Sequence, residues 1–235
     1  MEVGNDINLT DGEQWSFYNG VAKHFDDHVR LSVPLYEEGH KLICYLSDFF
    51  LKDDSSCYEI GSSTGTLIKK LYQRHHNKNN ITFYGVEPVK EMIEIAQNND
   101  NTEIEYINDS IENINMTPAN LIVGYYFLQF IPISKRKEVI QKIYDALVPG
   151  VGFILFEKEL PLDPKIYKLV TSSYMKFKID HGFSPEEVLS KQFSLEGAMV
   201  TNTHSENRRL LSSAGFSHIT TVMKYGEFNG YLCFK

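Results

Sequence analysis

The chain has 235 residues, of which 42% are hydrophobic and 23% are charged, and its formal net charge is −8. This length allows one sizeable α/β domain but hardly two, and the composition is that of a globular protein rather than a disordered one. The negative charge and the scattered lysines and arginines argue against a nucleic-acid binder with a broad basic face. We therefore expect a small-molecule substrate.

The N-terminus has no basic region followed by an apolar one, and no window approaches the roughly 18 apolar residues of a membrane span. We expect a cytoplasmic protein without a signal peptide or membrane contact. Three cysteines, Cys44, Cys57 and Cys233, lie far apart without metal-ligand spacing. This pattern predicts buried free thiols in a reducing compartment and no metal site.

The first 50 residues predict an N-terminal helical cap. Residues 1–13 are polar and acidic, and apolar side chains then recur at helical spacing from Trp15 to Val29. This amphipathic run is either a lid over a ligand or a packed helix, and the two interpretations are compatible. Pro34 precedes a second predicted helix, residues 37–50, which would hold Tyr36 near the next turn.

Residues 57–67 are the stretch around which the chain is organised. An apolar run that contains Glu59 meets Gly61 and Gly65, and a helical pattern follows at once. Gly61 would let the backbone turn sharply at the end of a strand. Gly65 would let the helix approach closely enough for its N-terminal amides to face a ligand. A nucleotide-like cofactor is the usual occupant of such a crevice.

The spacing E-x-G-x-S-x-G differs from the dinucleotide pattern G-x-G-x-x-G, because Ser63 stands where a middle glycine would approach a pyrophosphate. Glu59 would repel a phosphate but could hold a cationic amino group, directly or through water. The stretch resembles the first motif of the class I S-adenosylmethionine (SAM) methyltransferases. A glycine turn without any ligand is the alternative.

The next two predicted strands also end in acids. Residues 81–86 run into Glu87, 22 residues after Gly65, where doubly wound folds place a carboxylate on ribose hydroxyls. Residues 103–107 lead into Asp109 and Ser110. In SAM enzymes an acid or polar residue here commonly meets the adenine amine. Asp109 has an equal claim as a turn former and helix cap.

Residues 121–130 form a continuous apolar run, which predicts a central strand buried on both faces and opening on the same crevice. We place Tyr125 in the pocket and leave Tyr126 open between pocket and core. A helix over 134–147, closed by Pro149-Gly150, and a strand over 152–158 complete the order β-α-β-α-β-α-β-α-β. This alternation indicates a parallel sheet with right-handed crossovers.

Residues 160–200 interrupt the alternation with two helical stretches, 166–179 and 185–193. Such an insertion would cover the acceptor side or make a homodimer contact. A helix over 204–213 and strands over 216–223 and 230–234 follow. The prediction is one domain over residues 1–235, an α/β Rossmann-like fold with the seven-stranded class I methyltransferase sheet, an antiparallel terminal hairpin and helical insertions.

Five segments together resemble the CmoA family, the carboxy-S-adenosylmethionine synthases, over most of the chain from about residue 20. They are Ser32-Val33-Pro34-Leu35-Tyr36, residues 59–65, residues 126–130, residues 142–150 and Ala214-Gly215-Phe216. The resemblance implies cofactor contacts by Tyr36, Gly61 with Ser63, Glu87, and Asp109 with Ser110. The full predicted SAM site is Tyr36, Glu59, Gly61, Ser62, Ser63, Gly65, Glu87, Pro88, Asp109, Ser110 and Tyr125.

Two positions depart from the family. The arginine that holds the extra carboxylate of the family's modified cofactor, in a K-R-x-x-L-E-x-x-M pattern, is Gln192 here, and the asparagine of its fourth strand is Tyr125. A buried carboxylate without a cationic partner costs several kcal/mol. We therefore expect this chain to bind ordinary SAM.

These observations predict a SAM-dependent methyltransferase that acts on a small-molecule acceptor, a reaction in which positioning supplies most of the acceleration. Tyr125, Tyr174 and His181 are the catalytic candidates, and Glu157 is a further possible base or orienting group. Two alternatives stay open. One is a SAM-consuming enzyme without an external methyl acceptor, by internal displacement or by chemistry like that of the CmoA family. The other is a binding protein without turnover.

Overall fold

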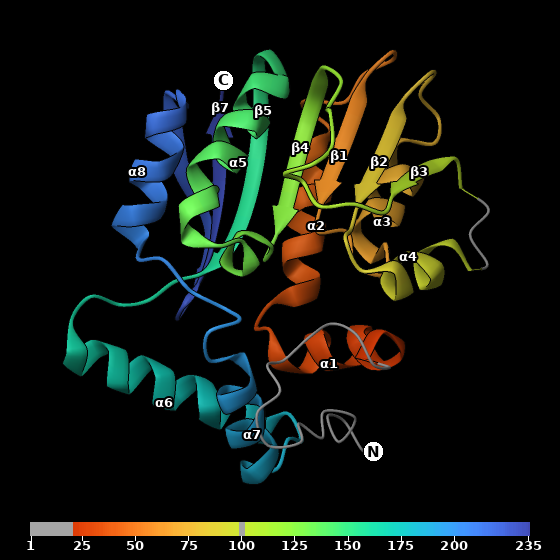
Figure 1. The fold of residues 1–235 in the computed structure, drawn as a ribbon. Coiled ribbons are helices and arrows are strands. Elements are labelled where there is room, and N and C mark those ends of the chain that lie inside the picture. The colour runs from red at the N-terminus through yellow and green to blue at the C-terminus, as the bar shows by residue number, and fades with distance from the viewer. Residues whose placement is uncertain (1–20, 99–101) are drawn as a thin grey trace.

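A computed structural model describes residues 21–98 and 102–235. They form a seven-stranded sheet with the strand order β3-β2-β1-β4-β5-β7-β6 (Figure 1). The strands are β1 (Ser56–Ile60), β2 (Thr82–Val86), β3 (Ile104–Ile107), β4 (Ala119–Tyr125), β5 (Leu147–Lys158), β6 (His218–Tyr225) and β7 (Phe228–Phe234). The first five strands pair in parallel, whereas β7 pairs antiparallel with both β5 and β6. The predicted fold class is confirmed.

Helices cover both faces of the sheet because successive strand residues point to opposite sides. In β1, Tyr58 and Ile60 pack toward α5 (Ile133–Ala146) and α8 (His204–Ala214). Cys57 packs on the other face against α2 (Tyr36–Ser47) and α3 (Thr66–His75). All three cysteines are buried free thiols, as predicted.

The cap and the insertion meet at the carboxyl end of the parallel strands (Figure 1). The cap consists of η1 (Val21–His24) and α1 (Phe25–Ser32), and α4 (Lys90–Gln97) packs near η1. The insertion consists of α6 (Pro164–Asp180) and α7 (Pro185–Leu195). Both helices of the insertion begin at a residue that caps the N-terminus with its side chain. Asp163 accepts hydrogen bonds from two amides of α6, and Ser184 forms a capping box with Glu187 at α7. The predicted positions Trp15, Phe17 and Tyr18 of the cap lie outside the described residues.

The strand predicted over residues 121–130 is too long at its carboxyl end. β4 ends at Tyr125, since Tyr126 has a left-handed backbone with φ +61°. The Glu157 side chain then accepts hydrogen bonds from the backbone N–H groups of Leu128 and Gln129, at 2.8 and 3.1 Å. These bonds support the short helix η2 (Leu128–Phe130) in place of further strand.

Two more predictions are corrected. The predicted helix between the third and fourth strands is absent from residues 108–118, all of which are described. Ile111 and Ile114 in this connection enter the core without it. Pro149-Gly150 does not lie between a helix and a strand but within β5. The Gly150 N–H donates to the carbonyl of Lys235 at 3.1 Å, which extends the strand beside the C-terminal residue.

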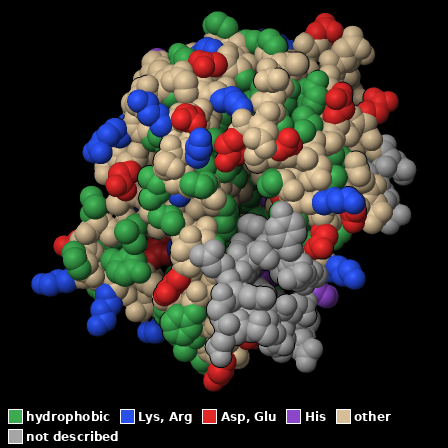
Figure 2. All heavy atoms as spheres, in the orientation of Figure 1, with side chains coloured by type: hydrophobic (Ala, Val, Ile, Leu, Met, Phe, Trp, Pro, Cys, Tyr) green, Lys and Arg blue, Asp and Glu red, His purple; other side chains and the backbone are tan. Residues whose placement is uncertain are grey.

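The insertion also carries exposed apolar side chains. Leu162, Ile166 and Leu169 are all more than half exposed, and Figure 2 shows apolar side chains among lysines over this part of the molecule. This surface could accept a second subunit, and the homodimer stays a prediction. None of the helices in the described part of the chain combines the length and the apolar character that crossing a bilayer requires.

Candidate functional site

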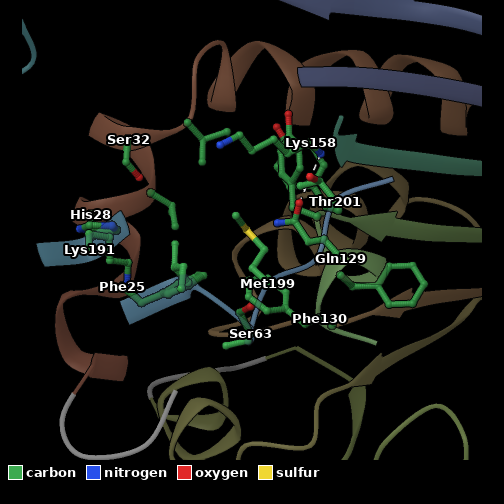
Figure 3. Close-up of a pocket in the computed structure, with 18 of the residues that line it drawn as sticks. Phe25, His28, Ser32, Ser63, Gln129, Phe130, Lys158, Lys191, Met199 and Thr201 are labelled. Carbon is green, nitrogen blue, oxygen red and sulfur yellow. Dashed lines mark hydrogen bonds between the residues drawn. The ribbon is translucent and has the colours of Figure 1, made fainter. Parts of the chain in front are cut away.

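A cavity of about 1110 Å³ lies at the carboxyl ends of β1, β2 and β4 and continues beneath α1, α6 and α7 (Figure 3). It brings together most of the predicted site. The predicted residues that line it are Tyr36, Glu59, Gly61, Ser62, Ser63, Glu87, Pro88, Ser110, Tyr125 and Tyr174. Gly65, Asp109 and His181 are not among its lining residues. Tyr126 and Gln192 do line the cavity. Of the two alternatives for Tyr126, pocket or core, the structure therefore supports the pocket.

The loop after β1 has the backbone that its glycines predict. Gly61 has φ +73°, and a Cβ atom there would lie only 2.8 Å from the Cβ of Phe127. Gly65 has φ +78°, and a Cβ atom there would lie 2.6 Å from the Tyr106 hydroxyl. Only Gly61 faces the cavity, whereas Gly65 allows packing behind the loop so that α3 can begin at Thr66.

Glu59 carries a buried carboxylate into the cavity. Its side chain is only 3% exposed and accepts a hydrogen bond from the Ile68 N–H of α3. Its Oε2 atom has no hydrogen-bond partner among the described residues. Burial raises the pKa of Glu59 well above its usual range. An unpaired buried carboxylate oxygen on a cavity fits the ammonium group of SAM, which would satisfy both its charge and its hydrogen bond.

Glu87 ties the end of β2 to the loop after β1. Its Oε2 accepts from the Ser63 N–H and its Oε1 from the Val89 N–H, both at 3.0 Å. Burial raises the pKa of Glu87, and these two backbone hydrogen bonds oppose the rise. Each oxygen keeps a lone pair beyond these bonds, so the carboxylate can still accept from a pair of ribose hydroxyls. The residues present therefore fit the ribose of SAM.

Asp109 and His181 make local contacts away from the cavity. Asp109 is exposed and accepts hydrogen bonds from the Ser110 N–H at 2.7 Å and the Asn113 side chain at 2.8 Å. These are the contacts of a turn former, although no helix follows Asp109, and Ser110 is the member of the pair that lines the cavity. The exposed His181 ring contacts the carbonyl of Phe177 at 2.7 Å. Neither side chain is positioned to touch a ligand in the cavity.

An aromatic wall joins α2 to β4. The Tyr125 hydroxyl donates to the carbonyl of Tyr36 at 2.8 Å, and the two ring centroids lie 5.3 Å apart. Tyr125 also packs on His40 and on Gly39, where any Cβ atom would collide with its hydroxyl. Tyr125, the position at which the sequence departs from the resembled family, is thus accommodated by a glycine on α2.

Sequence reasoning missed a pair of hydrogen bonds between the cap and the loop after β1, which we call the latch. Asp26 of α1 accepts hydrogen bonds from the hydroxyls of Thr64, at 2.7 Å, and Thr66, at 3.1 Å. The contact spans about 40 residues of sequence, so no local pattern could have indicated it. It holds α1 over the cavity.

Sequence reasoning also missed three lysines that line the cavity, Lys158 of β5, Lys178 of α6 and Lys191 of α7. The part lined by Lys178 and Lys191 of the insertion is called the basic side. The ammonium groups of Lys158 and Lys178 lie 4.6 and 4.7 Å from the ring centroid of Tyr174. The Tyr174 hydroxyl donates to the carbonyl of Ser32 at 2.9 Å, which joins the insertion to the cap. In Figure 3, Lys191 lies beside His28 and Phe25, across the cavity from Lys158.

Known proteins share both this sequence and this fold. A methyltransferase domain family matches residues 58–150. Carboxy-S-adenosyl-L-methionine synthase of Staphylococcus epidermidis is 34% identical over 224 residues, which cover 94% of this chain and 97% of that protein. The chain belongs to the carboxy-S-adenosylmethionine synthase family. The enzyme of the same name from Campylobacter lari is 32% identical, with 95% of each chain covered.

Family membership places the chain in the class I methyltransferase superfamily and confirms the predicted SAM-dependent transferase and its cofactor. Solved structures agree on the fold. Human N-acetylserotonin methyltransferase in complex with SAM has a TM-score of 0.64 at 15% identity, covering 92% of this chain and 56% of that one. A putative SAM-dependent methyltransferase of Methanococcus maripaludis has a TM-score of 0.60 at 18% identity, covering 97% of both chains.

Proposed function

We propose that the protein transfers the methyl group of SAM to a small-molecule acceptor that binds beside SAM in the same cavity. The supporting observation is the size of this cavity, about 1110 Å³, together with its cover of cap and insertion helices. Small-molecule pockets usually measure about 300–1,000 Å³. The cavity therefore has room for a second small reactant beside SAM.

The acidic wall would hold SAM. Glu59 would accept the ammonium group at Oε2, and Glu87 would accept the ribose hydroxyls. SAM supplies an electrophilic methyl group, which the lone pair of the acceptor takes while the electrons of the C–S bond return to sulfur. The chain's contribution is to hold both partners in line.

Tyr125 and Tyr174 would position the reactants in this reaction and would not act as bases. Each hydroxyl donates to a backbone carbonyl, of Tyr36 and Ser32 respectively. Burial raises the pKa of both phenols far above neutrality, so they stay protonated and do not serve as bases. An acceptor that ionises easily needs no base from the protein.

The test uses SAM labelled with ¹³C in its methyl group. The purified protein is incubated with a filtrate of small metabolites, and products are followed by mass spectrometry. We expect S-adenosylhomocysteine to accumulate only with the filtrate, and the label to enter a new small molecule. Equal SAM consumption without the filtrate, or label only in macromolecules, would contradict methyl transfer to a small acceptor.

A second candidate is formation of carboxy-SAM, because the named relatives are carboxy-SAM synthases over nearly their full length. Gln192 on the cavity argues against it, since the resembled family has an arginine there. The same experiment separates the two. A SAM derivative heavier by one CO₂ unit would support this second function.

A further inference from the structure

The short helix η2 is held at both of its ends by buried charged side chains. At the amino end, Glu157 of β5 accepts hydrogen bonds from the N–H groups of Leu128 and Gln129. At the carboxyl end, Arg136 of α5 donates from Nε to the carbonyl of Ile131 at 2.9 Å and from Nη2 to that of Gln129 at 3.3 Å. A helix of three residues leaves such groups without partners of its own. The acid and the base also stand at the ends that suit the helix dipole.

The same guanidinium group reaches the chain that returns from the insertion. Its Nη2 also donates to the carbonyl of Val200, and its Nη1 donates to the side-chain oxygen of Asn202 at 2.7 Å. The Val200 N–H in turn donates to the carbonyl of Gln129 at 2.9 Å. Arg136 is thus a shared donor to η2 and to residues 200–202. A lysine could not replace it, since only the planar guanidinium offers five N–H groups in fixed directions.

The two segments that Arg136 joins form a wall of the cavity. The residues of these segments that line it are Gln129, Phe130, Ile131, Ala198, Met199 and Thr201. Figure 3 shows Gln129, Met199 and Thr201 on the same side of the cavity. Arg136 and Glu157 are not lining residues, and they are only 3% and 2% exposed. They can therefore affect a reacting molecule only through this wall.

Arg136 also favours the form of Glu157 that accepts at both oxygens. Burial raises the pKa of Glu157 to about 8, while its two N–H partners and the Arg136 charge oppose the rise. Glu159 adds to the rise, the nearby Tyr126 phenol stays protonated, and the residue opposite on β7 is the neutral Asn229. Protonation would turn one acceptor oxygen of Glu157 into a donor. Loss of Arg136 should therefore loosen η2 at both ends.

We propose that Arg136 is a positioning residue for the SAM-dependent reaction, because it holds η2 and residues 200–202 together and so fixes the wall against which the second reactant lies. It would act on turnover rather than on SAM binding. The carboxylates that would hold SAM, Glu59 and Glu87, are fixed by backbone N–H groups of other segments. The inference holds whichever SAM-derived product the enzyme forms.

The test compares Arg136→Met with the wild type. SAM consumption with the metabolite filtrate is followed by mass spectrometry over a range of SAM concentrations. The rate is divided by the number of S-adenosylhomocysteine sites that calorimetry counts. We expect kcat per site to fall about tenfold or more, while KM for SAM and the affinity for S-adenosylhomocysteine change less than about threefold. Arg136→Lys keeps the charge but not the planar donors, and should lose nearly as much turnover.

Two further measurements separate positioning from folding. The Val200 amide should exchange its hydrogen faster in Arg136→Met, whereas residues 61–66 should exchange as in the wild type. The pH at which kcat is half-maximal on its rise should move upward by about one unit, because Glu157 loses its cationic neighbour.

Two control variants complete the set. Lys137→Met removes the exposed neighbour of Arg136 on α5 and should change nothing. Ser47→Ala breaks a buried hydrogen bond of 2.7 Å between the Ser47 hydroxyl and Nε2 of His75, neither of which lines the cavity. It should lower the unfolding temperature and leave kcat per site unchanged, which measures the effect of lost stability alone.

Unchanged kcat in Arg136→Met, or full turnover in Arg136→Lys, would overturn the inference. A loss of S-adenosylhomocysteine affinity equal to the loss of kcat would also overturn it, because Arg136 would then support the SAM site as a whole. So would a wild type that consumes no SAM. Methyl transfer to a small acceptor is judged separately in the same assay, by where the ¹³C label of the methyl group goes.

Discussion

The two sides of the cavity are built in different ways. On the acidic side, Glu59 and Glu87 sit at the ends of adjacent parallel strands, and neighbouring backbone N–H groups fix both carboxylates. On the basic side, Lys178 and Lys191 come from two helices of the insertion, which lie across the end of the sheet rather than within it. The acidic side is therefore preorganised by the sheet, and the basic side depends on how helices pack over it. We expect substitutions on the acidic side to have the larger effect on SAM.

Gly61→Ala should have the largest effect. A positive φ costs an alanine roughly 1–2 kcal/mol, and the new Cβ would press on Phe127, so the loop that carries Ser63 must shift. We expect SAM binding, measured by calorimetry, to weaken about 100-fold or more. Gly150→Ala is the matched control, because Gly150 has φ +81° but no atom within 4 Å of the place that a Cβ would occupy. If both variants bind SAM equally well, the steric account of Gly61 is wrong.

Glu59→Gln should weaken SAM binding by about 10- to 100-fold, the value of a charge-assisted hydrogen bond. The stability of the unliganded protein should instead increase. Because the pKa of Glu59 is raised above its usual 4.5 in the folded state, the native protein binds more protons and loses stability as the pH rises above about 4.5. The glutamine removes this loss.

The measurement for Glu59→Gln is therefore paired. At pH 8 the variant should unfold at a higher temperature than the wild type in the absence of ligand, while its affinity for SAM is lower. Lower stability at pH 8 together with unchanged affinity would mean that Glu59 is a structural acid and not the partner of an ammonium group.

Asp26→Ala tests the latch that closes the cap over the acidic side. It removes the acceptor of the Thr64 and Thr66 hydroxyls, so we expect SAM to bind up to about tenfold more weakly and to dissociate faster. Hydrogen exchange over residues 21–32 should also speed up. Asp27→Ala is the control, since Asp27 is exposed and its ion pair with Arg30 among the described residues lies on the surface, at 3.7 Å. Equal exchange in both variants would rule out the latch.

Asp109→Ala should have the smallest effect, because its carboxylate is occupied by Ser110 and Asn113 outside the cavity. We expect SAM affinity to fall less than about threefold, as for the loss of a turn contact at the surface. A loss of tenfold or more in a calorimetric titration would restore Asp109 as an adenine contact.

Much of the acidic side was predictable because its rules are local. The glycine spacing requires a left-handed turn at Gly61, and an acid at the end of the second strand must face the same crevice as that turn. The errors came where nonlocal contacts override a local pattern. The apolar run after Tyr125 does not continue the strand. The reason is that Glu157, on the neighbouring strand, accepts hydrogen bonds from the N–H groups of Leu128 and Gln129.

The sequence by itself determined the succession of strands along the chain, the turn after β1 and the two acids beside it, because each follows from spacing along a short stretch of chain. Only the tertiary structure decided that Asp26 meets Thr64 and that three lysines from β5, α6 and α7 share one cavity. Such contacts depend on how helices distant in sequence pack across the end of a sheet, and periodicity within each helix carries no information about its partner.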